Sequence, residues 1–179
     1  MSVSQREQGM SLVEVLIGIV IAGFALLGTA RLQALALNHA FMTSAHTAAA
    51  MQTSNLIAMM KSNPAYWQAV SDPFDVIVDI NNATRITGDA ALNAVTKDCF
   101  TATNCDQQDM AAQNLILWGQ SIDAGLPASR GQVTRIGSAI PPRFRITISW
   151  SEKLMSLGNN ATRYGAGNTA ANYQIVVQP

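Results

Sequence analysis

Residues 6–24 read REQGMSLVEVLIGIVIAGF, and this stretch decides the fold of the N-terminal part of the chain. From Met10 to Ala30 the only charged side chain is that of Glu14. An apolar helix of about 20 residues is long enough to span the hydrocarbon core of a bilayer. The run is longer than the apolar core of a removable signal peptide, and no Ala-x-Ala motif follows it closely. The stretch therefore favours a membrane anchor over a cleaved signal peptide.

The helical pattern continues beyond the apolar run, because neither proline nor glycine occurs between Arg31 and Lys61. Apolar residues recur there at spacings of three, four or seven, which places them on one face of a helix. This stripe comprises Leu35, Met42, Ala45, Ala49, Leu56 and Met59. Pro64 ends the pattern. The sequence predicts one helix from about Met10 to Ser62, apolar all round in residues 10–30 and amphipathic in residues 31–63.

A second helix is predicted after residue 106. Asp106 can cap its N-terminus, and an apolar stripe follows at helical spacing. The stripe comprises Ala111, Leu115, Trp118 and Ile122. Gly125 and Pro127 supply the stop.

Strands are predicted near the C-terminus, where residues 144–150 and 173–177 alternate between apolar and polar side chains. A short strand-like run also lies at residues 74–80, and a weaker strand signal lies at residues 133–136. We expect a small antiparallel sheet packed on the long helix, which is an α+β fold. Residues 158–172 lack any periodicity and are predicted to form a mobile surface loop, with a recognition loop as the alternative.

Composition bounds the class of protein. The chain has 179 residues, enough for one compact domain with an appended element. Charged residues make up only 12%, against about 25% in an average globular chain, so part of the surface should face lipid or protein. The formal net charge of zero gives no indication of nucleic-acid binding.

The two cysteines, Cys99 and Cys105, are closely spaced. Such a pair suits a disulfide in an oxidising compartment, where it would contribute roughly 2 kcal/mol. Two free thiols in a cytosolic protein are the alternative.

No catalytic or metal-binding pattern stands out. His39 and His46 share a helix face but lie about 10 Å apart along it, so one ion cannot bridge them. No nucleophile elbow, phosphate-binding loop or zinc-protease motif is present in the sequence. We therefore expect no enzyme activity, no cofactor and no metal.

The N-terminal residues also resemble a known family. A short polar leader ending in Gly9, then an apolar residue, then Glu14 and an uncharged run resemble the processing signal of type IV prepilins and type II secretion pseudopilins. The resemblance implies a leader of residues 1–9 that a prepilin peptidase removes between Gly9 and Met10. It implies that the new N-terminus at Met10 is methylated. It also implies a role in assembly for Glu14, through pairing with an N-terminal amine.

Three departures refine the resemblance. Met10 replaces the usual phenylalanine, and Glu7 beside Arg6 leaves the leader only weakly basic. Arg31 stands where many major pilins carry a proline, which favours a minor pilin. Residues 50–67, 109–127 and 143–152, with the cysteine pair, are similar to the PilV family of minor pilins.

The resemblance implies a structural subunit of a type IV pilus, in a tip complex that primes assembly and supports adhesion and twitching motility. Implied partners are other minor pilins, the major pilin, the prepilin peptidase and the inner-membrane assembly platform, with a tip adhesin as a further candidate. The chain would cross the inner membrane once and hold residues 64–179 as a periplasmic head before assembly, and lie in a surface pilus afterwards. The alternatives are a minor pseudopilin of a type II secretion system and a membrane-anchored periplasmic binding module.

Overall fold

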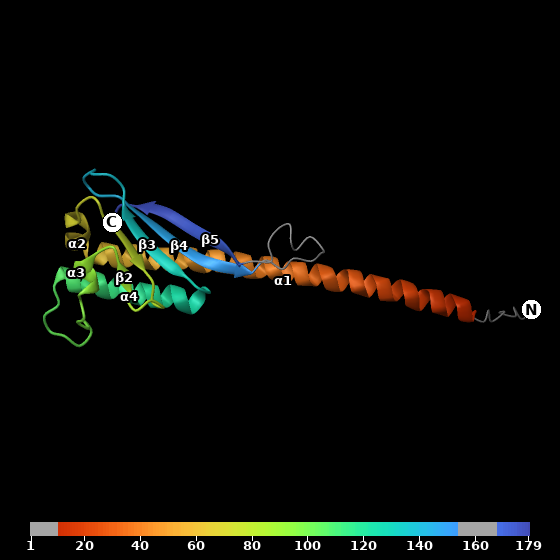
Figure 1. Cartoon of the computed structure of the whole chain (residues 1–179). Coiled ribbons are helices and arrows are strands. Elements are labelled where there is room, and N and C mark those ends of the chain that lie inside the picture. Colours follow the sequence, from red (N-terminus) through yellow and green to blue (C-terminus); the bar gives the residue numbers. More distant parts are fainter. Residues whose placement is uncertain (1–10, 154–167) are drawn as a thin grey trace, which may run out of the picture. The chain divides into compact units, whose positions relative to one another are not determined.

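The computed structural model describes residues 11–153 and 168–179 of the chain (Figure 1). It divides into two compact units, Met1–Ala40 and Phe41–Pro179. The helix α1 (Leu12–Ser62) contributes its first part to unit 1 and its last part to unit 2. Its bounds confirm the predicted long helix over the residues that the structure describes.

The described part of unit 1 is a helix whose side chains are exposed along residues 12–33. An 18-residue window of this helix has a mean hydropathy of 2.3, and none of it is buried. By length and composition it is the one helix in the described residues that could cross a membrane. Apolar side chains without cover are stable only against lipid or another protein.

The described residues of unit 2 contain four helical segments, the first of which is the last part of α1. After α1 come α2 (Pro64–Ala69), α3 (Ala90–Asn93) and α4 (Gln107–Gly125). Pro64 ends α1 as predicted, but it also begins α2, where its missing N–H costs nothing. The predicted second helix is α4, and Asp106 caps it with its side chain.

Five strands in the described part of the chain form one antiparallel sheet in the order β2-β1-β3-β4-β5. Their bounds are β1 (Asp75–Val78), β2 (Ile86–Thr87), β3 (Arg130–Arg135), β4 (Phe144–Lys153) and β5 (Asn168–Val177). Short connections and antiparallel pairing agree with the predicted sheet. The two-residue strand β2 was not predicted, because its pairing with Ile77 and Val78 is set by β1 and not by local periodicity.

The predicted loop over residues 158–172 is wrong at its C-terminal end. Asn168–Asn172 belong to β5 and pair with Ser149–Lys153 of β4. Asn and Ala, which make up most of this segment, are depleted in strands, and pairing with a neighbouring strand overrides that preference. Residues 158–167 lie outside the described residues.

One face of the sheet is buried. Phe144, Ile146, Ile148 and Trp150 of β4 point to the core, which confirms the predicted alternation. Within unit 2, α1 contributes Ala49, Thr53, Leu56 and Met60 to the same core. Of the predicted helix stripe, Ala49 and Leu56 are fully buried, whereas Met59 is half-buried and Met60 takes the central position.

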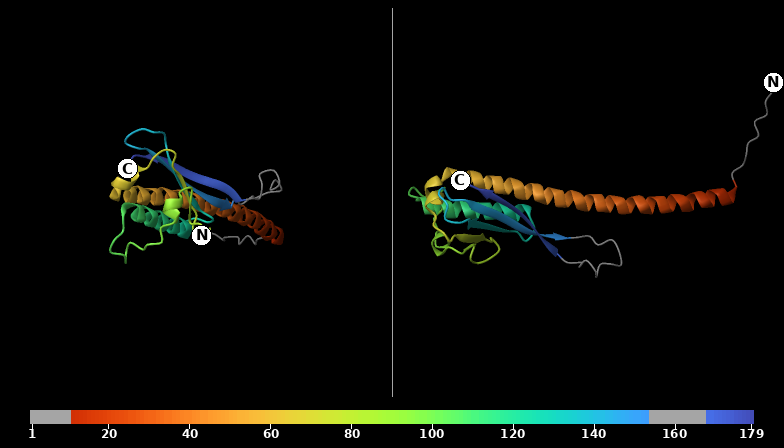
Figure 2. Two further views of the ribbon diagram at one scale, coloured as in Figure 1. Left: turned by 60° about the vertical axis from the view of Figure 1, so that its left-hand side comes forward. Right: turned by 90° about the horizontal axis from the view of Figure 1, so that it is seen from above.

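Two helices cover this buried face. Figure 2 shows α4 beside the C-terminal part of α1, both against the sheet. The Trp118 indole of α4 donates a hydrogen bond to the backbone carbonyl of Gln52 in α1 at 3.0 Å. The ring of Trp118 also lies against Gly131 of β3. A long helix packed on a small antiparallel sheet, with a second helix beside it, is the predicted α+β, type IV pilin-like fold.

Candidate functional site

Glu14 lies in the first turn of α1. Its backbone N–H donates to the carbonyl of Ser11 at 3.0 Å, so the residue begins the helical ladder. The exposed N–H groups of a first turn carry partial positive charge, which favours a carboxylate there. Glu14 is exposed, so its carboxylate is accessible to a cation outside the described residues.

The predicted cleavage site is Gly9–Met10, and Met10 is the predicted site of methylation. Both residues lie outside the described residues. The first residues that the structure describes, from Ser11, lead directly into α1.

The apolar part of α1 contains three glycines, at residues 18, 23 and 28. A Cβ added at any of them would meet no atom within 4 Å outside the helix backbone. No neighbour among the described residues therefore requires glycine at these positions. In a helix interior, glycine lowers helix stability by up to about 1 kcal/mol relative to alanine. The small side chains leave room for close approach by another helix.

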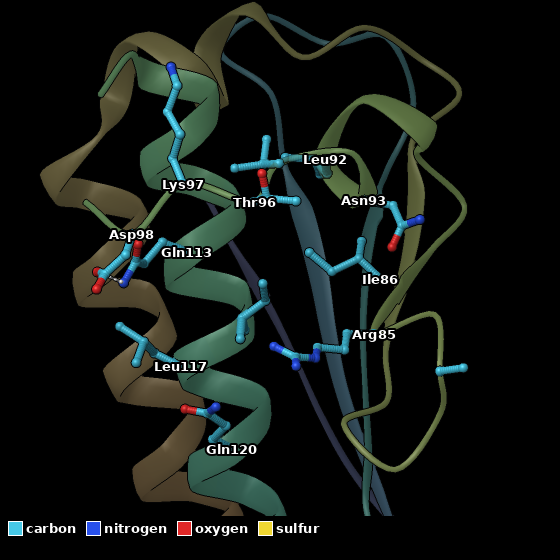
Figure 3. A pocket seen from close by; sticks show the side chains of 13 residues that line it. Arg85, Ile86, Leu92, Asn93, Thr96, Lys97, Asp98, Gln113, Leu117 and Gln120 are labelled. Carbon is cyan, nitrogen blue, oxygen red and sulfur yellow. Dashed lines mark hydrogen bonds between the residues drawn. The ribbon is translucent and has the colours of Figure 1, made fainter. Parts of the chain in front are cut away.

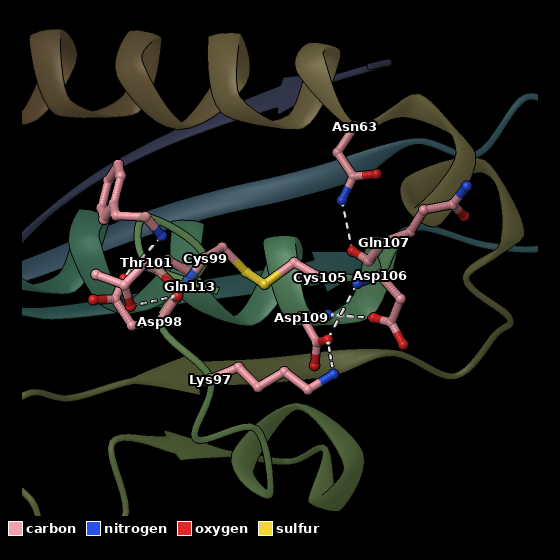
Figure 4. Close-up of a disulfide and its surroundings, with 11 residues drawn as sticks. Asn63, Lys97, Asp98, Cys99, Thr101, Cys105, Asp106, Gln107, Asp109 and Gln113 are labelled. Atoms are coloured by element: carbon pink, nitrogen blue, oxygen red, sulfur yellow. Dashed lines mark hydrogen bonds and ion pairs between the residues drawn. A yellow bond between two sulfur atoms is a disulfide. The ribbon is translucent and has the colours of Figure 1, made fainter. Parts of the chain in front are cut away.

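The head carries the disulfide that joins Cys99 to Cys105, with a Cα–Cα distance of 5.7 Å (Figure 4). The described residues contain no free cysteine. Gln113 of α4 holds this loop from one side, because its side-chain oxygen accepts from the Cys99 backbone N–H at 2.6 Å. The bridge therefore closes a short loop against the first half of α4.

The end of the loop is tied to the start of α4. Asp106 and Asp109 form a capping box, in which each carboxylate accepts from the other residue's backbone N–H. The Lys97 ammonium lies 2.6 Å from the Asp109 carboxylate. This hydrogen bond, with that from the Asp106 backbone, lowers the pKa of Asp109 below its usual value. Asn63 adds a bond to the Gln107 carbonyl at 2.7 Å, which joins the end of α1 to α4.

Asp98 organises the other end of the loop. Its carboxylate accepts from the Phe100 backbone N–H at 2.9 Å and from the Gln113 side chain at 3.2 Å. These bonds, that from Phe100 first, lower the pKa of Asp98. No sequence motif predicts the roles of Lys97, Asp98 and Gln113, because it is the folded loop that brings them to their partners.

The two histidines do not form a site together. The exposed ring of His46 lies edge-on to Trp150 with centroids 4.9 Å apart, and its Nε2 is 3.8 Å from Glu152. Trp150 donates to the same Glu152 carboxylate at 3.0 Å. Among the described residues, no three His, Cys, Asp or Glu side chains gather where they could hold a metal ion.

Comparison with known families finds a match to the N-terminal part of the chain. Residues 4–30 match the family model of the prokaryotic N-terminal methylation motif. This match supports a type IV prepilin-like family, which includes pilins and pseudopilins. The match and the apolar α1 fit a protein anchored in the membrane by a single span. Neither the curated proteins nor the solved structures contain a match to the chain.

Proposed function

We propose that the chain is a minor pilin: a low-abundance structural subunit of a type IV pilus tip complex that primes assembly and supports adhesion and twitching motility. The observation that carries the proposal is the methylation motif over residues 4–30, followed by a helix with an exposed apolar surface. Such a surface is stable in lipid before assembly, and against other pilin helices afterwards.

The proposal assigns a role to each segment of the chain. Residues 1–9 form the leader, 10–30 the transmembrane and assembly half of the helix, 31–63 its amphipathic half and 64–179 the periplasmic head. The peptidase cuts between Gly9 and Met10, and Met10 is methylated. The partners are the major pilin, other minor pilins, the prepilin peptidase, the assembly platform and a tip adhesin.

Glu14 has a specific part in the proposal. After cleavage it lies four residues from the new amine of Met10, about 6 Å along a helix. An acid within a membrane span is costly and usually functional. We propose that Glu14 pairs with the N-terminal amine of its own chain or of an adjacent subunit during assembly.

The assignment to the PilV family rests on sequence likeness in three ranges. Residues 50–67 form the end of α1 and α2, 109–127 cover most of α4, and 143–152 cover most of β4. Leu56, Trp67 and Trp118 from these ranges are buried in the core of unit 2. The resembling residues thus contribute to the hydrophobic core of unit 2.

A minor pseudopilin of a type II secretion system is the second candidate, because it would share the motif and the apolar helix. A deletion strain distinguishes the two. Loss of surface pili and twitching with normal exoprotein secretion supports the minor pilin. Loss of secretion with normal pili overturns it in favour of the pseudopilin.

A membrane-anchored periplasmic binding module is the candidate of another class. It predicts normal pili and normal secretion in the deletion strain, which would also overturn the minor pilin. Complementation with the unchanged gene is the control, because it separates the loss of this chain from effects on neighbouring genes.

A further inference from the structure

The sheet of unit 2 has two unlike edges. In the order β2-β1-β3-β4-β5, the outermost strands are β2 and β5. The strand β2 has 2 residues, whereas β5 has 10 and runs along the outer side of the sheet (Figure 1). A very short edge strand offers little backbone to another chain, but a long one presents a row of N–H and C=O groups. The strand β5 is therefore the edge at which another chain can pair.

The backbone of β5 is paired on one side. It runs antiparallel to β4, one residue opposite one residue, from Val177 opposite Phe144 to Asn168 opposite Lys153. Alternate residues of such a strand point their N–H and C=O groups to opposite sides, so about half of these groups in β5 point away from β4. In the described part of the chain, no backbone hydrogen bond joins β5 to a segment other than β4. An extended polypeptide matches the spacing of these groups.

The features that usually protect an edge strand are missing from β5. Natural edge strands are shielded by charged side chains, especially lysine, by proline or by a β-bulge. Residues 168–177 contain neither a charged residue nor a proline, and no bulge interrupts their register with β4. A partner strand would therefore meet no charge and no missing backbone donor along β5.

The apolar layer beneath the sheet is incompletely covered at β5. Ile146 of β4 is fully buried, but Ile175, which pairs with it, is 36% exposed. Ala171, Tyr173 and Val177 lie on the same face of β5, and each packs against the core but stays half-buried. Alternate residues of an added strand would lie beside this face. Apolar side chains at those positions would be removed from water together with Ile175.

We infer that β5 binds an extended, uncharged segment of another protein, which adds to the sheet as a further strand. The segment carries apolar side chains at alternate positions, where they cover Ile175. The choice of another protein over a second copy of this chain rests on the proposed function, because a low-abundance subunit is surrounded by other subunits. Strand addition would serve a pilin, a pseudopilin or a binding module alike, so the deletion phenotype and the binding test can fail independently.

The test uses the full chain in detergent micelles and two fluorescent octapeptides of alternating glutamine and valine. One probe carries N-methyl groups on all its valine nitrogens, and the other carries them on all its glutamine nitrogens. Each pattern blocks pairing on one side of the probe, because alternate N–H groups of a strand point to opposite sides. We expect one probe to bind saturably and the other to bind at least about tenfold more weakly, because it loses its ladder hydrogen bonds to β5.

The variant Ile175→Lys tests the site. An added apolar strand would cover the lysine on the core side of β5, so the affinity for the binding probe should fall about tenfold, because an unpaired charge is costly to bury. The matched control is Val176→Lys, with unchanged affinity expected. Val176 is the next residue, is 51% exposed and points to the opposite face, where a lysine stays in water. Thermal unfolding checks that the head is intact in each variant, and the two probes test the unchanged protein.

Hydrogen exchange followed by mass spectrometry locates the bound probe. Amides of residues 168–177 should gain protection, and those of β4 should keep theirs. A groove of about 620 Å³ between α4 and residues 83–98 is a competing place for an uncharged peptide, because both Arg85 and Asp98 line it (Figure 3). Amides of residues 83–98 should exchange at unchanged rates.

Equal binding of the two methylated probes would overturn the inference, and so would the absence of saturable binding by either. Equal loss of affinity in Ile175→Lys and Val176→Lys would do the same. Protection gained at residues 83–98 and not at 168–177 would place the peptide in the groove instead. A dimer of the purified chain whose β5 amides are protected without any probe would assign the edge to a second copy of this chain, which also overturns the inference.

Discussion

Gly131 of β3 is a position of close approach between the sheet and α4, because the ring of Trp118 lies directly against it. A Cβ there would lie 2.2 Å and 2.4 Å from two carbons of that ring. Trp118 cannot move away without breaking its hydrogen bond to the Gln52 carbonyl. The absence of a side chain at residue 131 thus fixes how α4, α1 and β3 meet within unit 2.

Replacing Gly131 with alanine should lower the free energy of unfolding of the head by about 1–3 kcal/mol, the usual cost of overpacking a core. Urea unfolding of the purified chain, followed by tryptophan fluorescence, measures it. Gly125→Ala is the control, because a Cβ at Gly125 would meet nothing within 4 Å. Equal effects of the two changes would contradict the steric explanation.

Glu14 places a carboxylate in the first turn of α1, in a helix segment that is otherwise apolar. We predict that Glu14→Gln leaves leader cleavage and membrane insertion intact, because the neutral side chain suits the membrane at least as well. It should reduce N-methylation or incorporation into pili, because the pairing with an amine is lost.

Mass spectrometry of the N-terminal peptide and immunoblots of sheared pili measure the two readouts. Glu7→Gln is the matched control, because Glu7 belongs to the leader that cleavage removes. Unchanged methylation and incorporation in Glu14→Gln would exclude the proposed pairing.

At the scale of elements, the segment from Lys97 to Gln113 behaves as one unit. The disulfide closes the loop, the capping box begins α4, and Lys97 and Gln113 link the two. The capping box and the disulfide both stabilise the segment of residues 97–113. Changes in either should therefore alter the stability of the head and leave membrane anchoring unchanged.

Removing the disulfide with Cys99→Ser and Cys105→Ser together should lower the stability of the head by about 2 kcal/mol, because the open loop has more conformations when unfolded. Urea unfolding measures the loss. Thiol labelling of the unreduced, denatured protein should find no free thiol. Full labelling of both cysteines in protein from the native membrane would contradict the bridge.

The two carboxylates of Asp98 and Asp109 predict that the stability of the head depends on pH. Both have a folded-state pKa below the usual value of 3.8, so their stabilisation is complete above that value. It is lost as the pH falls through the lower folded-state pKa. The melting temperature of the head should therefore fall as the pH drops below about 4, the usual pKa of these carboxyl groups.

Asp109→Asn should flatten this dependence, because it removes the carboxylate that Lys97 stabilises. Asp72→Asn is the control, since the Asp72 side chain has no hydrogen bond within the described residues. A pH profile that is the same for both variants would show that the Lys97–Asp109 contact is not responsible.

At the scale of the whole molecule, the proposed processing sets the length and the N-terminus of the mature chain. We predict that membrane-extracted protein comprises residues 10–179 with a methylated N-terminus. A bulky residue at Gly9 should block cleavage, because the peptidase must bring the scissile backbone close. Intact-mass analysis checks both. A chain that retains its leader, or one cut near Ala30, would contradict the proposed processing.

Sequence reasoning was most successful where structure depends on neighbours along the chain. The extent of α1, the Asp106 cap of α4 and the alternation in β4 all follow from local spacing. It was least successful at β2, at the start of β5 and in the choice of Met60 over Met59 as the buried methionine. Each of these depends on contacts with residues distant in the sequence, which no local pattern records.

The sequence by itself determined the anchor and the processing motif, because both depend on the composition and order of consecutive residues. Hydrophobic length requires lipid or protein around the N-terminal helix, and residues 4–30 match the prokaryotic N-terminal methylation motif. Only the tertiary structure decided the shape of the head. Pairing of β1 with β2, and packing of α4 against the sheet, bring residues 83–98 and 113–120 together to line one groove. That juxtaposition arises from backbone pairing and core burial across long sequence distances, so it becomes visible only when the chain is folded.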